Sequence, residues 1–364
     1  MKTANEKNTD IQILRAIAIL LVIAQHIRSR LPTPQAYHEI FNHVMFWPGV
    51  DIFFAISGFL ICKTFYRDIS TSLSKSDAIR SFWRRRAARL LPAVIFWAIA
   101  SVAISTFTES YPNTDPLLVA KSAASGILGV SNIYWASCVQ FSLQCGSADY
   151  NAVTWSLSLE WQLYAISTLI FSVAGFKRGI LILAAISVLF SILPAPSFSF
   201  PWVFRPQAFV IGVAIYFATR NISIQLKTPT SLLILIAGIS ICILSPLNVT
   251  HPYMIPFISL GAGLCLISTL SGQSISAIPS KILEWVGERS YSIYLCHLPM
   301  ILISRELLIR LNLLTPSYAN FILGLAIALS LIVISAEISY KLIEVPFQRK
   351  LSKRKLTLKS HSTV

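Results

Sequence analysis

Long apolar segments alternate with short polar stretches along almost the whole chain. Each apolar segment has about 17 to 25 residues, the length that a helix needs to cross the hydrocarbon core of a membrane. The pattern therefore predicts an all-α polytopic membrane protein with about ten transmembrane helices. The predicted helices cover residues 11–29, 48–66, 89–108, 156–176, 179–195, 202–219, 230–247, 253–271, 283–304 and 318–342.

Basic residues predict the orientation of these helices. With ten spans, 22 of the 30 Lys and Arg residues fall on the side of the two termini and six fall on the other side. Cytoplasmic loops carry the excess of Lys and Arg, so we expect both termini and a loop over 67–88 in the cytoplasm. The weaker apolar run 117–135 is expected to be an external or re-entrant segment, because a further span there would place Lys177 and Arg178 outside.

The composition narrows the class of protein. The chain is 55% hydrophobic and 12% charged, which excludes an ordinary soluble globular protein. Its formal net charge of +15 is spread between the apolar segments, a pattern that indicates membrane orientation rather than nucleic-acid binding. We expect a single transmembrane domain over 1–346 and a basic cytoplasmic tail over 347–364.

The six cysteines have no spacing typical of a metal site, and no metal is expected. Cys138 and Cys145 flank a short loop on the predicted outer side, where an oxidising compartment would permit a disulfide. The other four lie in apolar segments and are interpreted as packing residues.

The first apolar segment contains two residues that are costly in hydrocarbon, Arg15 and His26. They are eleven positions apart, so on a helix they face the same way and lie roughly 16–17 Å apart along its axis. An ionisable pair on one face of a membrane helix predicts a functional site. The alternative is an Arg that reaches back to the membrane surface and a His that hydrogen-bonds a neighbouring helix.

The second segment contains GVDIFFAISGFLI, with Asp51 at its outer end and Ser57 and Gly58 near its middle. Small residues let helices approach closely, so packing is the first interpretation of Ser57 and Gly58. Asp51 could instead orient a histidine or bind a sugar hydroxyl.

The basic motif RRRAARLLP places Arg85, Arg86 and Arg89 on one face of a helix. Guanidinium groups on the inner side of a membrane suit phosphate ligands. The same motif also fits an ordinary basic flank or a contact with anionic lipid.

Two later motifs place polar side chains along one helix face. In TWSLSLEWQLY these are Ser156, Glu160 and Tyr164, and a carboxylate there is costly unless it is paired or functional. In SYSIYLCHLP they are Ser290, Tyr294 and His297, which either line a site or hydrogen-bond their surroundings.

The last motif, KLIEVPF, places Glu344 just before Pro346. We expect a helix-terminating structural role there.

Taken in order, these motifs resemble the acyltransferase-3 family of integral-membrane acyltransferases, which typically O-acetylate bacterial cell-surface carbohydrates. The resemblance covers residues 15 to 346. Trp161 stands where the family often has a second acidic residue, so Glu160 is expected to be the carboxylate that matters. Cys296 stands where an aromatic residue is common. The chain resembles the standalone form, without the SGNH-type domain that some members carry.

The resemblance implies a multi-pass protein of the bacterial inner membrane that uses cytoplasmic acetyl-CoA as a co-substrate, without a bound cofactor. The implied acceptor is a carbohydrate, such as a lipid-linked O-antigen of lipopolysaccharide or an exopolysaccharide. His26 is expected to be the general base or transient acyl acceptor, with Glu160 or Asp51 orienting it. The expected acyl-CoA ligands are Arg15, Arg85, Arg86 and Arg89. The expected cavity-lining residues are Ser57, Ser156, Tyr164, Ser290, Tyr291, Tyr294 and His297.

Two other classes stay open. A transporter or flippase of a lipid-linked glycan would move its substrate without releasing CoA. A different class of membrane-bound acyltransferase with a buried histidine would use lipid or protein acceptors.

Overall fold

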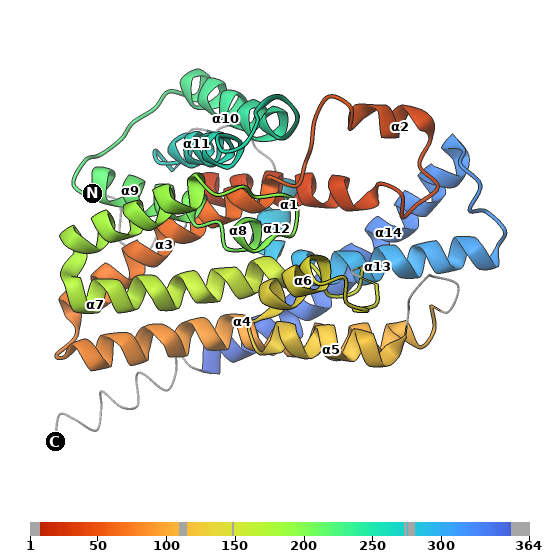
Figure 1. Cartoon of the computed structure of the whole chain (residues 1–364), viewed down its shortest axis with the longest axis horizontal. Coiled ribbons are helices and arrows are strands. Elements are labelled where there is room, and N and C mark those ends of the chain that lie inside the picture. The colour runs from red at the N-terminus through yellow and green to blue at the C-terminus, as the bar shows by residue number, and fades with distance from the viewer. Residues whose placement is uncertain (1–7, 109–114, 148, 273–274, 276–280, 351–364) are drawn as a thin grey trace. The chain divides into compact units, whose positions relative to one another are not determined.

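The computed structural model describes residues 8–108, 115–147, 149–272, 275 and 281–350. This part of the chain contains helices and no strand (Figure 1). The α-helices are α1 (Thr9–Ile27), α2 (Gln35–Ile40), α3 (Gly49–Thr71), α4 (Lys75–Ser105), α5 (Pro116–Ile127), α6 (Ser131–Gln140), α7 (Thr154–Ser191), α8 (Phe200–Val203), α9 (Gln207–Thr219), α10 (Thr228–Asn248), α11 (Met254–Ile267), α12 (Lys281–Glu288), α13 (Ser290–Arg310) and α14 (Tyr318–Ser339). A π-helical segment, η1 (Tyr340–Glu344), follows α14.

Eight helical stretches in the described residues have the length and hydropathy of a membrane span. One of them, α7, is interrupted at Gly175, where a positive φ of 72° separates two apolar halves. These halves correspond to the predicted spans 156–176 and 179–195, and the shorter apolar helix α11 corresponds to 253–271. The protein is therefore an all-α polytopic membrane protein, as predicted, whereas the cytoplasmic placement of its termini stays a prediction.

The chain divides into two compact units. The first, here called unit 1, comprises residues 1–63 and 160–290, and the second, unit 2, comprises 64–159 and 291–364. The predicted single domain over 1–346 stays a prediction. Of the predicted basic tail, residues 351–364 lie outside the described part of the chain.

In unit 1, α3 and α9 pack through glycine on both sides. A Cβ atom added at Gly58 would lie 2.0 Å from the carbonyl oxygen of Phe209, and one added at Gly212 would lie 2.0 Å from that of Ala55. No side chain fits at either position, so the two backbones approach as closely as small residues allow. The packing interpretation of Gly58 is confirmed.

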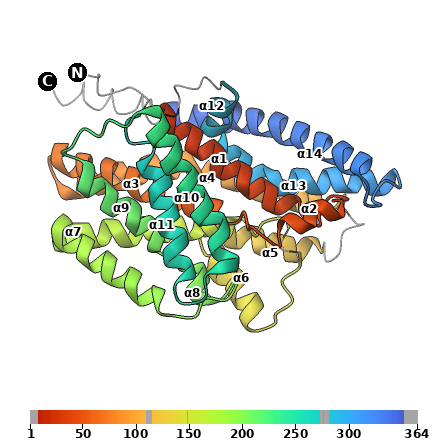
Figure 2. The same ribbon diagram turned by 90° about the horizontal axis from the view of Figure 1, so that it is seen from above.

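Also in unit 1, α10 and α11 lie side by side (Figure 2). Gly238 and Gly261 face each other, because a Cβ on either would lie 2.7 Å from the carbonyl oxygen of the other. Cys242 and Cys265 follow one turn later on their helices and are fully buried. Their predicted role as packing residues is confirmed.

In unit 2, the arginine-rich segment is helical rather than a loop. We expected a cytoplasmic loop over 67–88, but α3 continues to Thr71 and α4 begins at Lys75. The side chain of Ser74 caps α4 by accepting the backbone N–H of Asp77 at 3.1 Å. The prediction of a loop was wrong because hydropathy detects only the apolar part of a helix, whereas Ala and Arg also favour helix in a polar stretch. The cytoplasmic placement of this segment stays a prediction.

Two further boundaries differ from the prediction. The expected span 283–304 is divided at Arg289 into α12 and α13. The last helix does not stop at Pro346: it widens into η1 and continues to Lys350. The wider turn changes the hydrogen-bond pattern just before proline, which has no N–H to donate. The predicted helix-terminating role of this motif is therefore wrong.

The run 117–135 forms parts of two short helices, α5 and α6, on either side of Gly129, whose φ is 72°. The 12 residues of α5 extend for about 18 Å, which is less than the roughly 30 Å core of a membrane. Neither helix is long enough to span, in agreement with the prediction of an external or re-entrant segment.

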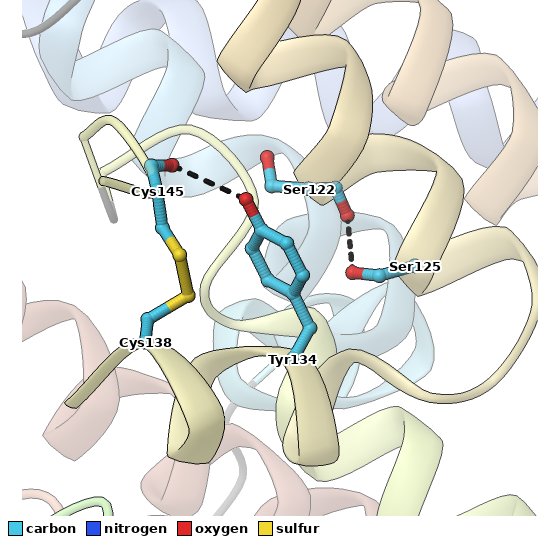
Figure 3. The surroundings of a disulfide bond; sticks show 5 residues. All are labelled: Ser122, Ser125, Tyr134, Cys138 and Cys145. Atoms are coloured by element: carbon cyan, nitrogen blue, oxygen red, sulfur yellow. Dashed lines mark hydrogen bonds between the residues drawn. A yellow bond between two sulfur atoms is a disulfide. The ribbon is translucent and has the colours of Figure 1, made fainter. Parts of the chain in front are cut away.

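A disulfide closes the loop that follows α6 (Figure 3). Cys138, in α6, is bonded to Cys145, and their Cα atoms are 6.0 Å apart. The hydroxyl of Tyr134 donates a hydrogen bond to the carbonyl oxygen of Cys145 at 3.4 Å. Burial raises the pKa of the Tyr134 phenol, because the charged phenolate is disfavoured away from water.

Candidate active site

Arg15 and Ser290, both predicted site residues, are brought together in unit 1. The Nε–H of Arg15 donates to the hydroxyl of Ser290 at 3.0 Å, and Ser290 is buried. Helix α12 packs along α1, and a Cβ added at Gly287 would lie 1.9 Å from the carbonyl oxygen of Gln12. Glycine thus lets the segment before Ser290 approach α1, and the hydroxyl fixes one edge of the guanidinium.

His26 lies in the last turn of α1 and its side chain is half-buried. Its backbone carbonyl accepts a hydrogen bond from a guanidinium N–H of Arg30 at 2.9 Å. Arg15 and His26 belong to one uninterrupted helix, so the predicted axial spacing of roughly 16–17 Å between them is maintained.

Glu160 is held by hydroxyl groups. The hydroxyls of Ser57 and Tyr164 both donate to its Oε1 atom. Tyr164 lies four residues after Glu160 on α7, so their predicted shared face is confirmed. Ser57 comes from α3, directly before Gly58, at the close approach of α3 and α9. Three predicted residues from two distant segments of unit 1 therefore form one polar cluster.

Asp51 forms a buried ion pair with Arg205. The Nε and Nη2 groups of Arg205 donate to the Oδ1 and Oδ2 atoms of Asp51 at 3.0 and 3.1 Å. Each side chain is about 1% exposed. This bidentate geometry is the strongest form of a carboxylate–guanidinium contact. Both oxygens of Asp51 are engaged, so any effect of Asp51 on chemistry acts through this pair.

Two tryptophans enclose the guanidinium of Arg205. Its Cζ atom lies 4.1 Å from the ring centroid of Trp202 and 5.0 Å from that of Trp47. Its third nitrogen donates to the carbonyl oxygen of Trp202 at 3.2 Å. Aromatic faces attract a cation and exclude water, which allows this charge to be buried.

Arg205 is not among the predicted site residues, and its position in the sequence predicts only a cation of an outer segment. One signal could have found it. Asp51 and Arg205 carry opposite charges, and both lie at the predicted outer ends of apolar segments, one at the start of 48–66 and the other inside 202–219. Charges at matching depth in apolar segments tend to pair.

In unit 2, Ser156 and Tyr294 are joined by a 2.6 Å hydrogen bond, and the Tyr294 hydroxyl also lies 3.1 Å from the carbonyl oxygen of Val153. His297 is fully buried, and its Nδ1 atom lies 2.8 Å from the carbonyl oxygen of Tyr294. This contact is made when Nδ1 carries the proton, which leaves Nε2 as the acceptor of a neutral ring.

Tyr291 and Glu344 each have a partner elsewhere in unit 2. The hydroxyl of Tyr291 donates to the carbonyl oxygen of Leu90 at 2.7 Å. Glu344 is buried in η1 and accepts a hydrogen bond from the hydroxyl of Ser292. Tyr291 thereby ties α13 to α4.

The three motif arginines lie half-buried on α4, also in unit 2. Arg85 pairs with Asp68 and donates to the hydroxyl of Ser81 at 2.5 Å. The Cζ atom of Arg86 lies 5.7 Å from the ring centroid of Phe82. Arg89 follows Arg85 by one helical turn.

The match to known protein families decides the identity. The acyltransferase-3 family, described as an acyltransferase domain, matches residues 8–336. The chain belongs to this family. Because the match covers most of the chain, it includes every predicted site residue from Arg15 to His297 and supports an acyltransferase enzyme.

Curated relatives of this acyltransferase-3 chain include O-acetyltransferases. A protein of Staphylococcus aureus strain COL, named provisionally as an O-acetyltransferase, is 29% identical, with 93% of this chain and 56% of the relative aligned. The peptidoglycan O-acetyltransferase OatA of Listeria monocytogenes is 29% identical, with 92% of this chain and 55% of the relative aligned. The O-acetyltransferase OatA of Staphylococcus aureus strain NCTC 8325 is 27% identical, with 93% and 56% aligned.

The chain spans about half the length of these relatives. No solved structure matches it.

Proposed function

We propose that this acyltransferase-3 chain moves an acetyl group from cytoplasmic acetyl-CoA to a hydroxyl of a cell-surface or lipid-linked carbohydrate. The observation that carries the proposal is the pair of ionisable residues on α1, Arg15 anchored by Ser290 and His26 three turns further along the same face. A relative named as a peptidoglycan O-acetyltransferase supports a glycan acceptor. O-antigen and exopolysaccharide remain further candidate acceptors.

In this mechanism the neutral imidazole of His26 takes the proton of the acceptor hydroxyl. The hydroxyl oxygen attacks the thioester carbonyl carbon, forming the new C–O bond through a tetrahedral intermediate. The C–S bond then breaks, and the proton passes from the imidazolium to the leaving CoA thiolate. A variant of the scheme forms an acyl-imidazole first and transfers the acetyl group from it to the acceptor.

Arg15, Arg85, Arg86 and Arg89 are proposed to bind the phosphates of CoA. Guanidinium groups bind phosphate oxygens through paired, charge-assisted hydrogen bonds. Asp68 and Ser81 hold Arg85 in one orientation, which reduces the entropy that binding would cost.

The remaining predicted residues receive supporting roles in the proposal. Glu160, with Ser57 and Tyr164, orients the imidazole or the acceptor hydroxyl. Asp51 acts by fixing Arg205. For Ser156, Ser290, Tyr291, Tyr294 and His297, a cavity-lining role stays a proposal.

The disulfide supports the proposed orientation in the membrane. Disulfides persist outside the cytosol, so the Cys138–Cys145 loop is proposed to lie on the outer, acceptor side of a bacterial inner membrane. This placement agrees with the distribution of Lys and Arg, which puts 117–135 on the same side.

The test is CoA release from acetyl-CoA by the purified protein, with extracted lipid-linked glycans as acceptors. We expect glycan-dependent release that falls at least about 100-fold in His26→Ala. The control is His251→Ala, which changes an exposed histidine in the turn after α10. The wild-type rate should fall as the pH is lowered from about 8 to 5, because acid protonates the imidazole that must accept a proton.

Unchanged release in His26→Ala would remove His26 from the chemistry and leave Glu160 and His297 as the next candidates. An absence of CoA release with every glycan, together with glycan movement across proteoliposomes, would replace the enzyme by a transporter.

A further inference from the structure

The segment 28–48 closes over the end of α1 that carries His26. The last carbonyl groups of a helix have no partners within it. Here the hydroxyl of Tyr37 donates to the carbonyl oxygen of Ala24 at 2.7 Å, and a guanidinium N–H of Arg30 donates to that of His26 at 2.9 Å. The phenol of Tyr37 is protonated throughout the physiological range, and burial raises its pKa further, to about 12.

Gln25 connects the C-terminal end of the segment 28–48 to the last turn of α1. Its side-chain oxygen accepts two backbone N–H groups, that of Phe46 at 2.8 Å and that of Trp47 at 3.2 Å. One side chain next to His26 therefore satisfies two consecutive donors more than twenty residues further along the chain.

Trp47 connects this attachment to the buried ion pair. Its ring centroid lies 5.8 Å from that of Trp202 and 5.0 Å from the Cζ atom of Arg205. Arg205 is held in turn by both oxygens of Asp51. A continuous set of contacts within unit 1 thus leads from the buried ion pair to the residue that precedes His26.

We propose that Gln25, with the segment 28–48, positions the imidazole of His26 for proton transfer. The terminal turn of a helix frays unless it is held, and fraying would move the side chain that it carries. Misplacement of a reacting group by about 1 Å can cost on the order of 100-fold in rate. The inference rests on the proposed role of His26, and Gln25 acts through His26 rather than on the substrate.

The test uses Gln25→Leu, which removes the acceptor, and Gln25→Glu, which keeps oxygen acceptors at the same place. The matched control is Gln225→Leu, the same change at an exposed position outside the segment 28–48. Tyr37→Phe removes only the hydroxyl that caps Ala24, and it serves as a second variant if Gln25→Leu does not fold. Two quantities are measured: kcat with KM for acetyl-CoA, and the rate at which diethyl pyrocarbonate modifies His26, followed by peptide mass spectrometry.

We expect Gln25→Leu to lower kcat at least tenfold, to leave KM for acetyl-CoA within about twofold, and to raise the modification rate of His26 several-fold. Gln25→Glu and Gln225→Leu should resemble the wild type, and Tyr37→Phe should change both quantities in the same direction by a smaller factor. Wild-type kcat and modification rate in both Gln25→Leu and Tyr37→Phe would overturn the inference, as would a change confined to KM. If the wild type transfers no acetyl group, the proposed function fails, whereas the modification rates still decide whether Gln25 controls His26.

Discussion

Asp51 and Glu160 are two carboxylates of the same unit, and they are satisfied in opposite ways. Asp51 is fully buried and receives two hydrogen bonds from one guanidinium. Glu160 is half-buried and receives hydrogen bonds from the uncharged hydroxyls of Ser57 and Tyr164. A carboxylate paired with a cation is neutralised and held, whereas one held by hydroxyls keeps its charge available to a third group. The comparison favours a structural role for Asp51 and a role in the reaction for Glu160.

The largest effect is expected on breaking the ion pair. Arg205→Met leaves the Asp51 carboxylate buried without its cation, which should lower the free energy of unfolding by about 3–5 kcal/mol. Thermal unfolding of the protein in detergent measures the loss. The double variant Asp51→Leu/Arg205→Met removes both charges and should regain most of the stability. A single variant as stable as the wild type would refute the structural role of the pair.

The next largest effect is expected at Glu160, and on activity rather than on stability. Glu160→Gln keeps an oxygen that Ser57 and Tyr164 can reach, so the unfolding free energy should change by less than about 1.5 kcal/mol. Loss of the negative charge should lower kcat on the order of 100-fold. The control Glu39→Gln makes the same change at an exposed site in α2. If Glu160→Gln instead unfolds the protein and the folded fraction keeps its kcat, the contrast with Asp51 disappears.

The smallest effect is expected for one hydroxyl of the Glu160 cluster. Tyr164→Phe removes one of the two hydrogen bonds to Oε1 and should lower kcat about tenfold, because the carboxylate is held less firmly. Tyr318→Phe, at an exposed tyrosine, is the control. Steady-state kinetics of CoA release measures both variants. An activity of Tyr164→Phe equal to that of the control would show that Ser57 alone suffices to hold Glu160.

Much of the fold was predictable because a membrane span needs a long apolar run, and such runs can be read from the chain. The positions of the eight long apolar helices and of the shorter α11 follow this rule. The rule failed where helices leave the apolar region. The polar start of α4 at Lys75 and the continuation past Pro346 depend on helix propensity and on local hydrogen bonding, to which hydropathy is insensitive.

The candidate site was predictable where its residues share one helix. The spacings of Arg15 with His26 and of Glu160 with Tyr164 determine a common face through the helical period alone. Partners from other segments were not predictable in the same way. No helical spacing joins Gln25 to Phe46, and only the matching predicted depth of two opposite charges points from Asp51 to Arg205.

By itself, the sequence determined that this protein is a polytopic helical membrane protein of the acyltransferase-3 family, with ionisable residues at fixed positions in its helices. Only the tertiary structure decided which of those charges are neutralised and which are held by uncharged groups. The physical reason is that hydrophobic length and helical period are local properties of a chain. The pairing of a buried charge depends instead on which distant segment supplies its partner, as Arg205 does for Asp51 and Ser57 does for Glu160.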